Sequence, residues 1–333
     1  MFNCFDKASY QGFEVHIVKY PLNNEAPFSF NLNKNISFYE KDDYPSQYHL
    51  IDLIDQIKPG AIFISGWIDK EYLKAIKNSL LSSKKILMID TPWNGNIKQT
   101  LWSIYFKFCK KKFFDSIWVP GSPQVKYALK LGFKKEEVFN GIYTCNDDIF
   151  NKKKHEIKAR NNPRKFIFIG RYIKEKGIEE LCNNFIELNS KQDDKWELWC
   201  IGNGKLWNSR IQNKFIKHFG FIQPDALTGI ISKSDAYILP SNYEPWGVSL
   251  HEMVSMGKPV LVSENVGSSY CFAKNGINGF VFSHKKENDF KIKMKKMMQL
   301  SDEDFDQMGK ESVHLSKAFS SDKWIKTLKE IYD

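Results

Sequence analysis

Hydrophobic and polar positions follow two patterns along the chain. Short apolar runs predict strands in the first half at 13–18, 61–65, 85–90 and 116–119, and in the second half at 165–170, 196–201, 236–240 and 259–263. Amphipathic stretches between them predict helices at 70–81, 123–131, 178–189 and 248–256. Runs such as IFISG and FIFIG are typical of parallel strands covered on both faces. Strands that alternate with helices predict an α/β fold with parallel sheets.

The chain divides into two halves at a polar, basic run. Residues 151–164 include KKKHEIKARNNPR, which has almost no apolar content and predicts a linker between a domain at 1–150 and another at 165–315. A length of 333 residues also favours two domains over one core. Residues 316–333 carry Trp324, Ile325 and Leu328 at helical spacing, so we expect a last helix that packs back on the first domain. Two such domains facing across a cleft would bind a ligand beyond the carboxyl ends of their strands.

Composition narrows the class of protein. The hydrophobic fraction of 42% and the charged fraction of 26% are ordinary for a globular protein. No apolar stretch approaches the 18 or so residues of a membrane-spanning helix, and the N-terminus does not resemble a secretory signal. The six cysteines are irregularly spaced without a CxxC motif, which favours reduced thiols over a zinc site or disulfides. We therefore expect a cytoplasmic protein.

The net charge of +10 is uneven, with +7 in residues 1–160 and +3 in the remainder. A basic first half could attract an anionic membrane, a phosphorylated substrate or nucleic acid, or it could simply reflect a lysine-rich and asparagine-rich coding bias. No nucleic-acid recognition motif is present, so we expect no nucleic-acid partner. No GxGxxG follows a first strand, which argues against a nicotinamide dehydrogenase.

Two cations follow the first predicted strand of the second half. The strand ends at Gly170, Arg171 follows at once, and Lys176 stands five residues later, just before a predicted helix. An arginine fork and a lysine point charge beside a helix N-terminus can hold a diphosphate. The alternative is that both are ordinary solvated charges at a loop.

A second group of residues lies in SNYEPWGVSLHEMVSMGKPVL, at 241–261. Glu244 lies in the turn after a predicted strand, and Glu252 lies within the helix that begins near Gly247. The first amides of that helix, at Gly247, Val248 and Ser249, are unpaired and can bind phosphate oxygens. The two carboxylates can accept hydrogen bonds from vicinal diols such as those of a sugar and a ribose. The alternative is a surface glutamate pair with no ligand.

The segment EPWGVSLHE resembles the paired-glutamate motif of retaining glycosyltransferases of the GT-B fold, especially glycosyltransferase family 4. FIGRYIKEKGI resembles that family's Gly-Arg…Lys-Gly segment, and IGNGKL (201–206) its glycine loop. HFGFIQPDAL (218–227) and GKPVLVSENVGSSYCFAKNGINGFVF (257–282) continue the match in the family's order, so that it covers nearly all of 164–290. The resemblance implies two Rossmann-like domains and a nucleoside-diphosphate sugar, of the UDP or GDP type, as donor.

The resemblance also implies the role of each residue. The diphosphate would be bound by Arg171 and Lys176, the donor sugar by Glu244 and the ribose by Glu252. The remaining donor contacts implied are Gly170, Gly202, the backbone at Phe221 and Ile222 beside the base, and the amides of Gly247, Val248 and Ser249. Transfer would retain the anomeric configuration, with the leaving diphosphate helping to deprotonate the acceptor and the protein stabilising that leaving group. No metal is implied, and the Asp pairs at 42–43, 147–148 and 193–194 look like solvated turns because no Asp-x-Asp ends a strand.

SGWIDKEYL (65–73), IDTPWNG (89–95) and WVPGSPQVKYALKLGF (118–133) resemble the N-terminal halves of bacterial members. Gly66, Trp67, Asp90 and Trp93 would then line the acceptor side, with Asp90 orienting an acceptor hydroxyl and the tryptophans stacking on a sugar. A capping aspartate and packed aromatic side chains are the alternative. The acceptor would be a saccharide or lipid-linked hydroxyl in the synthesis of a bacterial surface polysaccharide.

Two features at the first domain add expectations. Only about a dozen residues precede GFEVHIVKY, too few for the βα unit that normally opens such domains, so a truncated start or a damaged acceptor domain is expected. A degenerate member that binds a nucleotide sugar without turnover is therefore the alternative function. The basic and aromatic segment KFCKKKFF (107–114) could lie on anionic lipid, at the inner face of the plasma membrane, or form a helix with a core face of Tyr105, Phe106 and Phe113 and a basic outer face.

Overall fold

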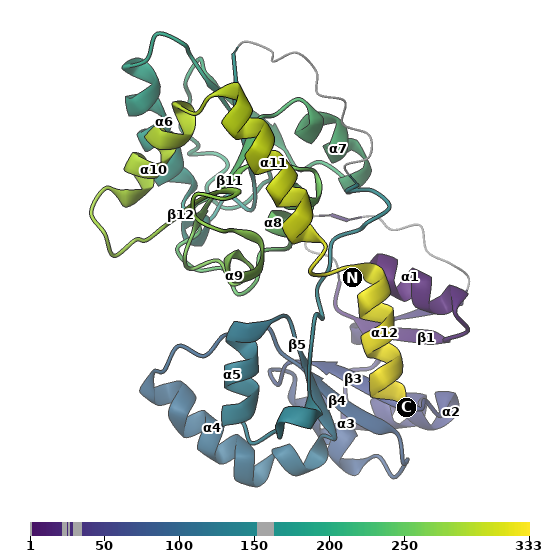
Figure 1. The fold of residues 1–333 in the computed structure, drawn as a ribbon. Coiled ribbons are helices and arrows are strands. Elements are labelled where there is room, and N and C mark those ends of the chain that lie inside the picture. Colours follow the sequence, from purple (N-terminus) through teal and green to yellow (C-terminus); the bar gives the residue numbers. More distant parts are fainter. Residues whose placement is uncertain (1, 22–24, 26, 29–34, 152–162) are drawn as a thin grey trace. The chain divides into compact units, whose positions relative to one another are not determined.

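The computed structural model describes residues 2–21, 25, 27–28, 35–151 and 163–333. They form an α/β protein that separates into two compact units (Figure 1). The first unit comprises Met1–Pro21, Phe30–Thr144 and Ser321–Asp333, and the second comprises Leu22–Ser29 and Cys145–Ser320. The predicted linker at 151–164 lies mostly outside the described residues. No helix in the described part is long and apolar enough to cross a membrane.

The first unit contains a four-stranded parallel sheet in the order β3-β4-β5-β6 and a separate parallel pair, β1-β2. Its strands are β1 Val15–Lys19, β2 Ile36–Glu40, β3 Ala61–Ser65, β4 Lys84–Met88, β5 Ser116–Val119 and β6 Val138–Asn140. Its α-helices are α1 Phe2–Tyr10, α2 Gln47–Ile57, α3 Lys70–Asn78, α4 Ile97–Cys109, α5 Ser122–Lys130 and α12 Ser321–Tyr332. Short 3₁₀ turns are η1 Lys41–Asp43, η2 Lys111–Phe113 and η3 Lys135–Glu137.

The last helix of the chain belongs to the core of the first unit. α12 lies beside α1 (Figure 1), and the Trp324 ring packs on Trp118 of β5 with centroids 4.8 Å apart. The indole N–H of Trp324 donates to the carbonyl of Ile142 at 3.0 Å. The apolar stripe expected at 321–333 therefore faces this core, with Trp324, Ile325, Leu328 and Ile331 all buried.

The second unit is built on a six-stranded parallel sheet in the order β12-β11-β10-β7-β8-β9. Its strands are β7 Lys165–Ile169, β8 Glu197–Ile201, β9 Ile216–Gly220, β10 Ala236–Leu239, β11 Val260–Ser263 and β12 Gly279–Phe282. Its helices are η5 Lys174–Lys176, α6 Ile178–Ser190, α7 Pro224–Ser232, α8 Val248–Ser255, α9 Ser269–Phe272, α10 Asp289–Met298 and α11 Asp302–Ser316.

Parallel strands covered on both faces are confirmed in this sheet. Every residue of β10 and β11 is buried, as the continuous apolar sequences predicted. Parallel order places the carboxyl ends of β7, β8, β9 and β10 along the same edge of the sheet. The loops that follow these strands, together with the start of α8, carry every residue predicted to bind the donor.

Candidate functional site

Three glycines hold the loops after β7, β8 and β9 together. The Gly170 amide donates to the carbonyl of Ile201 at 3.0 Å, and the Gly202 amide donates to Gly220 at 2.7 Å. Gly202 has a φ of +130°, and a Cβ there would overlap the carbonyl oxygen of Gly170. Only glycine fits at 202 without moving this backbone. The glycine loop therefore fixes the position of the Gly170–Arg171 segment.

Tyr172 anchors the segment that carries Arg171. Its amide donates to the carbonyl of Asn203 at 2.9 Å, and its side chain is fully buried. Arg171, one residue earlier, is exposed, and its guanidinium makes no hydrogen bond or ion pair with any described residue. The structure thus presents a cation to solvent on a firmly held backbone.

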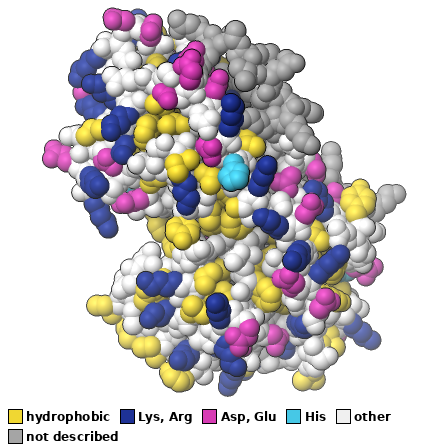
Figure 2. Space-filling view, viewed as in Figure 1, with side chains coloured by type: hydrophobic (Ala, Val, Ile, Leu, Met, Phe, Trp, Pro, Cys, Tyr) yellow, Lys and Arg dark blue, Asp and Glu magenta, His cyan; other side chains and the backbone are white. Residues whose placement is uncertain are grey.

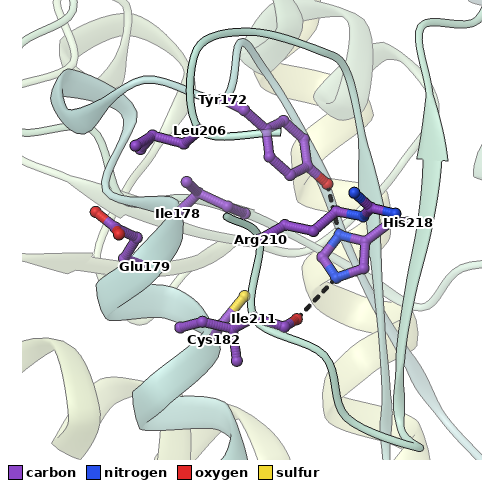
Figure 3. Close-up of a pocket in the computed structure, with 8 residues that line it drawn as sticks. All are labelled: Tyr172, Ile178, Glu179, Cys182, Leu206, Arg210, Ile211 and His218. Atoms are coloured by element: carbon purple, nitrogen blue, oxygen red, sulfur yellow. Dashed lines mark hydrogen bonds between the residues drawn. The ribbon is translucent and has the colours of Figure 1, made fainter. Parts of the chain in front are cut away.

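The anchor extends into a small cavity under this loop (Figure 3). The Tyr172 hydroxyl meets Nδ1 of His218 at 2.8 Å, and Nε2 of His218 lies 2.9 Å from the carbonyl of Ile211. Since a carbonyl only accepts, Nε2 carries the proton and Nδ1 accepts from the tyrosine. Burial lowers the pKa of His218, which keeps the ring neutral. The cavity has room for about one water molecule, so it supports the loop and does not form a ligand site.

Lys176 and Glu244 form an ion pair between the loops after β7 and β10. Their side chains are only 15% and 14% exposed. The two loops are also joined through the backbone, because the Asn242 amide donates to the carbonyl of Glu175 at 2.8 Å. The second cation and the first glutamate predicted for the site therefore meet directly, on backbone that is fixed from both sides.

The turn that holds Glu244 is tied to the loop after β11. The Gly267 amide donates to the carbonyl of Glu244 at 2.9 Å, and Ser268 donates from its hydroxyl to the carbonyl of Gly247 at 3.0 Å. Gly247 has a φ of +89°, which favours glycine. Trp246 is buried between these residues and packs on Phe272 and Phe319. Glu244 and the start of α8 are thus held in one rigid turn.

α8 begins at Gly247, and no described side chain caps it. Val248 and Ser249 are half-buried in its first turn. The Ser249 hydroxyl lies 2.7 Å from the hydroxyl of Tyr237, a fully buried side chain of β10. An uncapped helix start offers free amides to an anion, so the backbone feature predicted at 247–249 is present.

Glu252 lies one turn further along α8. Desolvation by burial raises the pKa of its carboxyl to about 7. The pKa of Tyr237 is raised by burial and also by the charges of Glu252 and Glu244, so both carboxylates act on one buried hydroxyl. No described residue forms a hydrogen bond or an ion pair with the Glu252 carboxylate. The charges of the two glutamates therefore act on the same buried hydroxyl, and among the described residues Glu252 has no hydrogen-bond or ion-pair partner.

The residue before Glu252 has a structural role that the sequence did not indicate. His251 is buried and stacks on Phe272 at 4.3 Å. Its Nδ1 accepts from the Cys145 amide at 3.0 Å, and its Nε2 donates to the carbonyl of Ser316 at 3.0 Å. Burial lowers its pKa to about 4, so the ring is neutral. His251 therefore anchors α8 in the fold, and the next residue, Glu252, is a candidate ligand residue.

Phe221 and Ile222 are half-buried in the loop after β9. The Phe221 ring packs edge to face on Phe28 with centroids 5.1 Å apart, and Nε2 of the Gln223 side chain donates to the carbonyl of Pro27 at 2.8 Å. A segment from far earlier in the chain therefore covers this loop. Sequence analysis missed Phe28, since no local pattern marks a contact between residues so distant along the chain.

The predicted acceptor-side residues gather at one end of the first unit. Trp67 and Trp93 both contact Tyr127, with centroids 6.0 and 5.6 Å away, and both pack against the main core cluster. Gly66 donates to the carbonyl of Met88 at 2.7 Å, and the Asp90 carboxylate accepts from Tyr143 at 3.4 Å. Trp67 and Trp93 thus pack against the core, as the alternative of packed aromatic side chains describes. Asp90 does not cap α4, because Asn96 does so.

The segment at 107–114 differs from one expectation. Phe106 is buried and Phe113 packs against the core, but Tyr105 is exposed. Prediction of Tyr105 in the core face was wrong, because the core side of α4 is formed by residues 102, 103 and 106. The outer face is also less basic than expected, since apolar side chains occupy it.

The sequence of the second unit matches a known protein family. Residues 149–313, about half of the chain, match the family model described as glycosyl transferases group 1. An uncharacterized glycosyltransferase, MJ1607 of Methanocaldococcus jannaschii, is 27% identical over 160 residues, which is 44% of this chain and 40% of that protein. An uncharacterized 41.2 kDa protein in the cps region of Klebsiella pneumoniae is 22% identical over 260 residues, 74% of this chain and 70% of that protein.

A solved structure supports the fold over the whole chain. The structure described as trehalose-6-phosphate from E. coli bound with UDP-2-fluoro glucose superposes with a TM-score of 0.70 at 9% identity. The superposition covers 96% of this chain and 92% of that chain. The two parallel sheets of four and six strands match this GT-B structure.

Proposed function

From the premise that the chain belongs to the glycosyl transferases group 1 family, we propose that it transfers a sugar, with retention, from a nucleoside-diphosphate sugar to a hydroxyl group. The observation that carries this proposal is the convergence of Lys176, Glu244, Glu252 and the free start of α8 on one turn. These groups match the chemistry of a nucleotide sugar, which has a diphosphate, a ribose diol and sugar hydroxyls.

Binding of the donor would exchange ionic partners. Without a ligand, the Lys176 ammonium pairs with Glu244. A donor diphosphate brings a larger negative charge, and Arg171, which pairs with no residue in the described part of the chain, lies just after β7 where it could bind that charge. Lys176 would turn from Glu244 to a phosphate oxygen, and Glu244 would then accept hydrogen bonds from the donor sugar. Glu252 would accept from the ribose diol, and the amides of α8 would bind phosphate.

Catalysis would follow from stabilising the leaving group. As the bond between sugar and phosphate breaks, negative charge grows on the diphosphate, where two cations and the helix start are already oriented. A leaving oxygen that gains charge is itself a base for the acceptor hydroxyl on the same face of the sugar. We propose that the reaction needs no metal, because Arg171 and Lys176 supply the positive charge that a metal would give.

We propose that the second unit binds the donor and the first the acceptor, through Gly66, Asp90 and the surfaces beside Trp67 and Trp93. The Klebsiella relative is encoded in a cps region, which supports an acceptor in surface polysaccharide synthesis, either a saccharide or a lipid-linked sugar. The solved structure with UDP-2-fluoro glucose supports UDP as the nucleotide to test first.

The test is calorimetric binding of UDP and GDP to the wild type, to Glu252→Ala, and to Glu287→Ala as a control at an exposed glutamate of the same unit. We expect one nucleotide to bind, with affinity lowered about 10- to 100-fold in Glu252→Ala because a hydrogen bond to a charged group is lost. Equal affinity in all three proteins would refute the assignment. A protein that binds a nucleotide but neither hydrolyses nor transfers any nucleotide sugar, whether or not a chelator is present, would instead be a degenerate member of the family.

A further inference from the structure

The outward side of α4 is apolar. Ile97, Leu101, Ile104, Tyr105 and Phe108 are 78%, 64%, 54%, 45% and 72% exposed. At about 100° per residue these five positions fall within an arc of about 100° on one side of the helix. The opposite side carries Ser103 and Phe106, which are buried in the core of the first unit. A surface helix normally has one apolar face, whereas α4 has two.

The exposed stripe is continuous over the whole helix. Each of these side chains has a neighbour three or four residues away in the stripe, which is the spacing at which side chains lie next to each other on a helix surface. The exposed apolar area amounts to several hundred Å², which is at the upper end for a monomer and marks an interaction site. Figure 2 shows apolar side chains along the edge of the first unit where α4 lies in Figure 1.

Lysines border this stripe. No aspartate or glutamate occurs between Asp90 and Asp115, while lysine occurs five times. Lys98 and Lys107 lie on the two flanks of the arc, and both are exposed. Nζ of Lys107 lies over the Phe108 ring at 5.9 Å, and Nζ of Lys110 lies over Tyr105 at 6.0 Å. Their aliphatic stems thus run along the aromatic rings, and the charges remain free to reach anions.

A groove opens beside the stripe, between α4 and the end of α5. It has a volume of about 380 Å³ and is lined by Trp93, Ile104, Phe108, Lys107 and Lys130 together with two small polar side chains. Apolar walls and two ammonium groups make a groove that suits an acyl chain ending in a phosphate. The same chemistry continues from the stripe into the groove.

We propose that α4 docks on an anionic lipid bilayer. The helix would lie along the membrane surface, with Leu101, Ile104 and Phe108 among the acyl chains and the lysines on headgroup phosphates, as interfacial helices do. A second copy of the chain fits less well, because two such faces would bring the like charges of Lys98, Lys107 and Lys110 of each copy together, and α4 itself carries no acidic residue. In the segment KFCKKKFF, Phe108 is the aromatic side chain that reaches outward, since Phe114 is buried and Phe113 packs against the core.

The test is co-sedimentation with vesicles of phosphatidylcholine alone and with about 30% phosphatidylglycerol, where the anionic lipid supplies the charge that lysines need. We expect the wild type to bind only the anionic vesicles, and more weakly in high salt. Leu101→Ser with Phe108→Ser should lower the partition coefficient at least about tenfold, because two interfacial side chains are lost. Lys107→Glu with Lys110→Glu should abolish binding. Ile292→Ser with Lys233→Glu, at exposed positions of the second unit, should bind as the wild type does.

Three results would overturn the proposal: no binding to anionic vesicles, equal binding to both vesicle types, or unchanged binding of the Leu101→Ser and Phe108→Ser variant. A dimer in light scattering that the same substitutions dissociate would assign the face to a second copy instead. Binding of free phosphate or of a soluble phospholipid analogue that is lost in Lys107→Glu, found together with no binding to anionic vesicles, would assign only the groove and contradict docking on a bilayer. The assay needs no nucleotide sugar, so its result is independent of the proposed transfer.

Discussion

Glu252 allows a prediction in which stability and binding change in opposite directions. Its carboxyl is desolvated in α8, and its pKa is raised from 4.5 to about 7. Glu252→Gln keeps the shape of the side chain and removes the charge. We expect this substitution to stabilise the folded protein at neutral and alkaline pH while it weakens nucleotide binding.

The sign follows from proton binding. The folded carboxyl keeps its proton to a higher pH than the unfolded one, so the wild type loses stability as the pH rises from about 4.5 to about 7. One pKa unit corresponds to about 1.4 kcal/mol, so the full loss is roughly 3 kcal/mol. Glu252→Gln has no such loss. Its advantage should be near zero at about pH 4.5 and should reach roughly 3 kcal/mol above about pH 8.

The assay is urea unfolding of the wild type, Glu252→Gln and Glu287→Gln at a series of pH values. Only differences between the proteins are compared, because every other titrating group is common to all three. Two compact units can unfold in separate transitions, so the transition of the second unit is followed by buried tryptophans such as Trp196 and Trp246. Glu287→Gln controls for the loss of one negative charge at an exposed position.

A difference between Glu252→Gln and the wild type that does not change with pH would refute the reasoning, because it would show an ordinary pKa for Glu252 in the folded state. The matching result on binding is a loss of affinity for the nucleotide in the more stable variant. Since ribose hydroxyls donate to a carboxylate, wild-type affinity should rise with pH up to about 7–8, by less than tenfold per pH unit, and this rise should be absent in Glu252→Gln.

Three further predictions concern the residues around the site. Lys176→Ala should weaken nucleotide diphosphate binding about 10- to 100-fold by calorimetry, and an equal loss in Lys174→Ala, at an exposed neighbour, would argue against a specific contact. Gly202→Ala should lower both thermal stability and nucleotide affinity because its Cβ would collide with Gly170, whereas Gly229→Ala has open space and should change neither. His251→Ala should cost about 2–4 kcal/mol in urea unfolding. Since the folded pKa of His251 is lowered to about 4, its contribution is present above about pH 6.5 and is lost as the pH falls towards 4, and a loss that is the same at all pH values would contradict a neutral buried ring.

The sequence predicted the central strands β4, β5, β7, β8, β10 and β11 and the edge strand β3, but it did not predict the edge strands β6, β9 and β12. β10 and β11 are buried along their whole length, so their sequences are continuous apolar runs. β9, β12 and β6 lie at the edges of their sheets, are only three to five residues long, and are not buried along their whole length. An edge strand covers less of the core, so its sequence carries a weaker pattern.

Part of the candidate site could likewise be predicted from local sequence, and part could not. Glu244 and Glu252 could be expected to lie near each other because both belong to one short motif around a helix start, where local sequence determines local structure; their role stays a prediction. The Lys176–Glu244 pair, the Tyr237 hydroxyl under both carboxylates and the contact of Phe28 with Phe221 depend on segments that meet only in the folded chain. The exposed face of α4 was missed for another reason: apolar periodicity identifies the positions that share a face, but not which face the core covers.

The packing of α12 on β5 has a consequence for synthesis and for engineering. Because the last helix completes the core of the first unit, residues 145–320 are in effect an insertion within that unit. During translation the second unit can fold while the first still lacks Trp324. The first unit, whose synthesis begins first, therefore completes its folding last. A chain that ends before residue 321 should therefore retain a folded second unit and expose Trp118 of β5 in the first, and a tag placed after α12 would lie next to the first unit, which is built mainly from residues before 145.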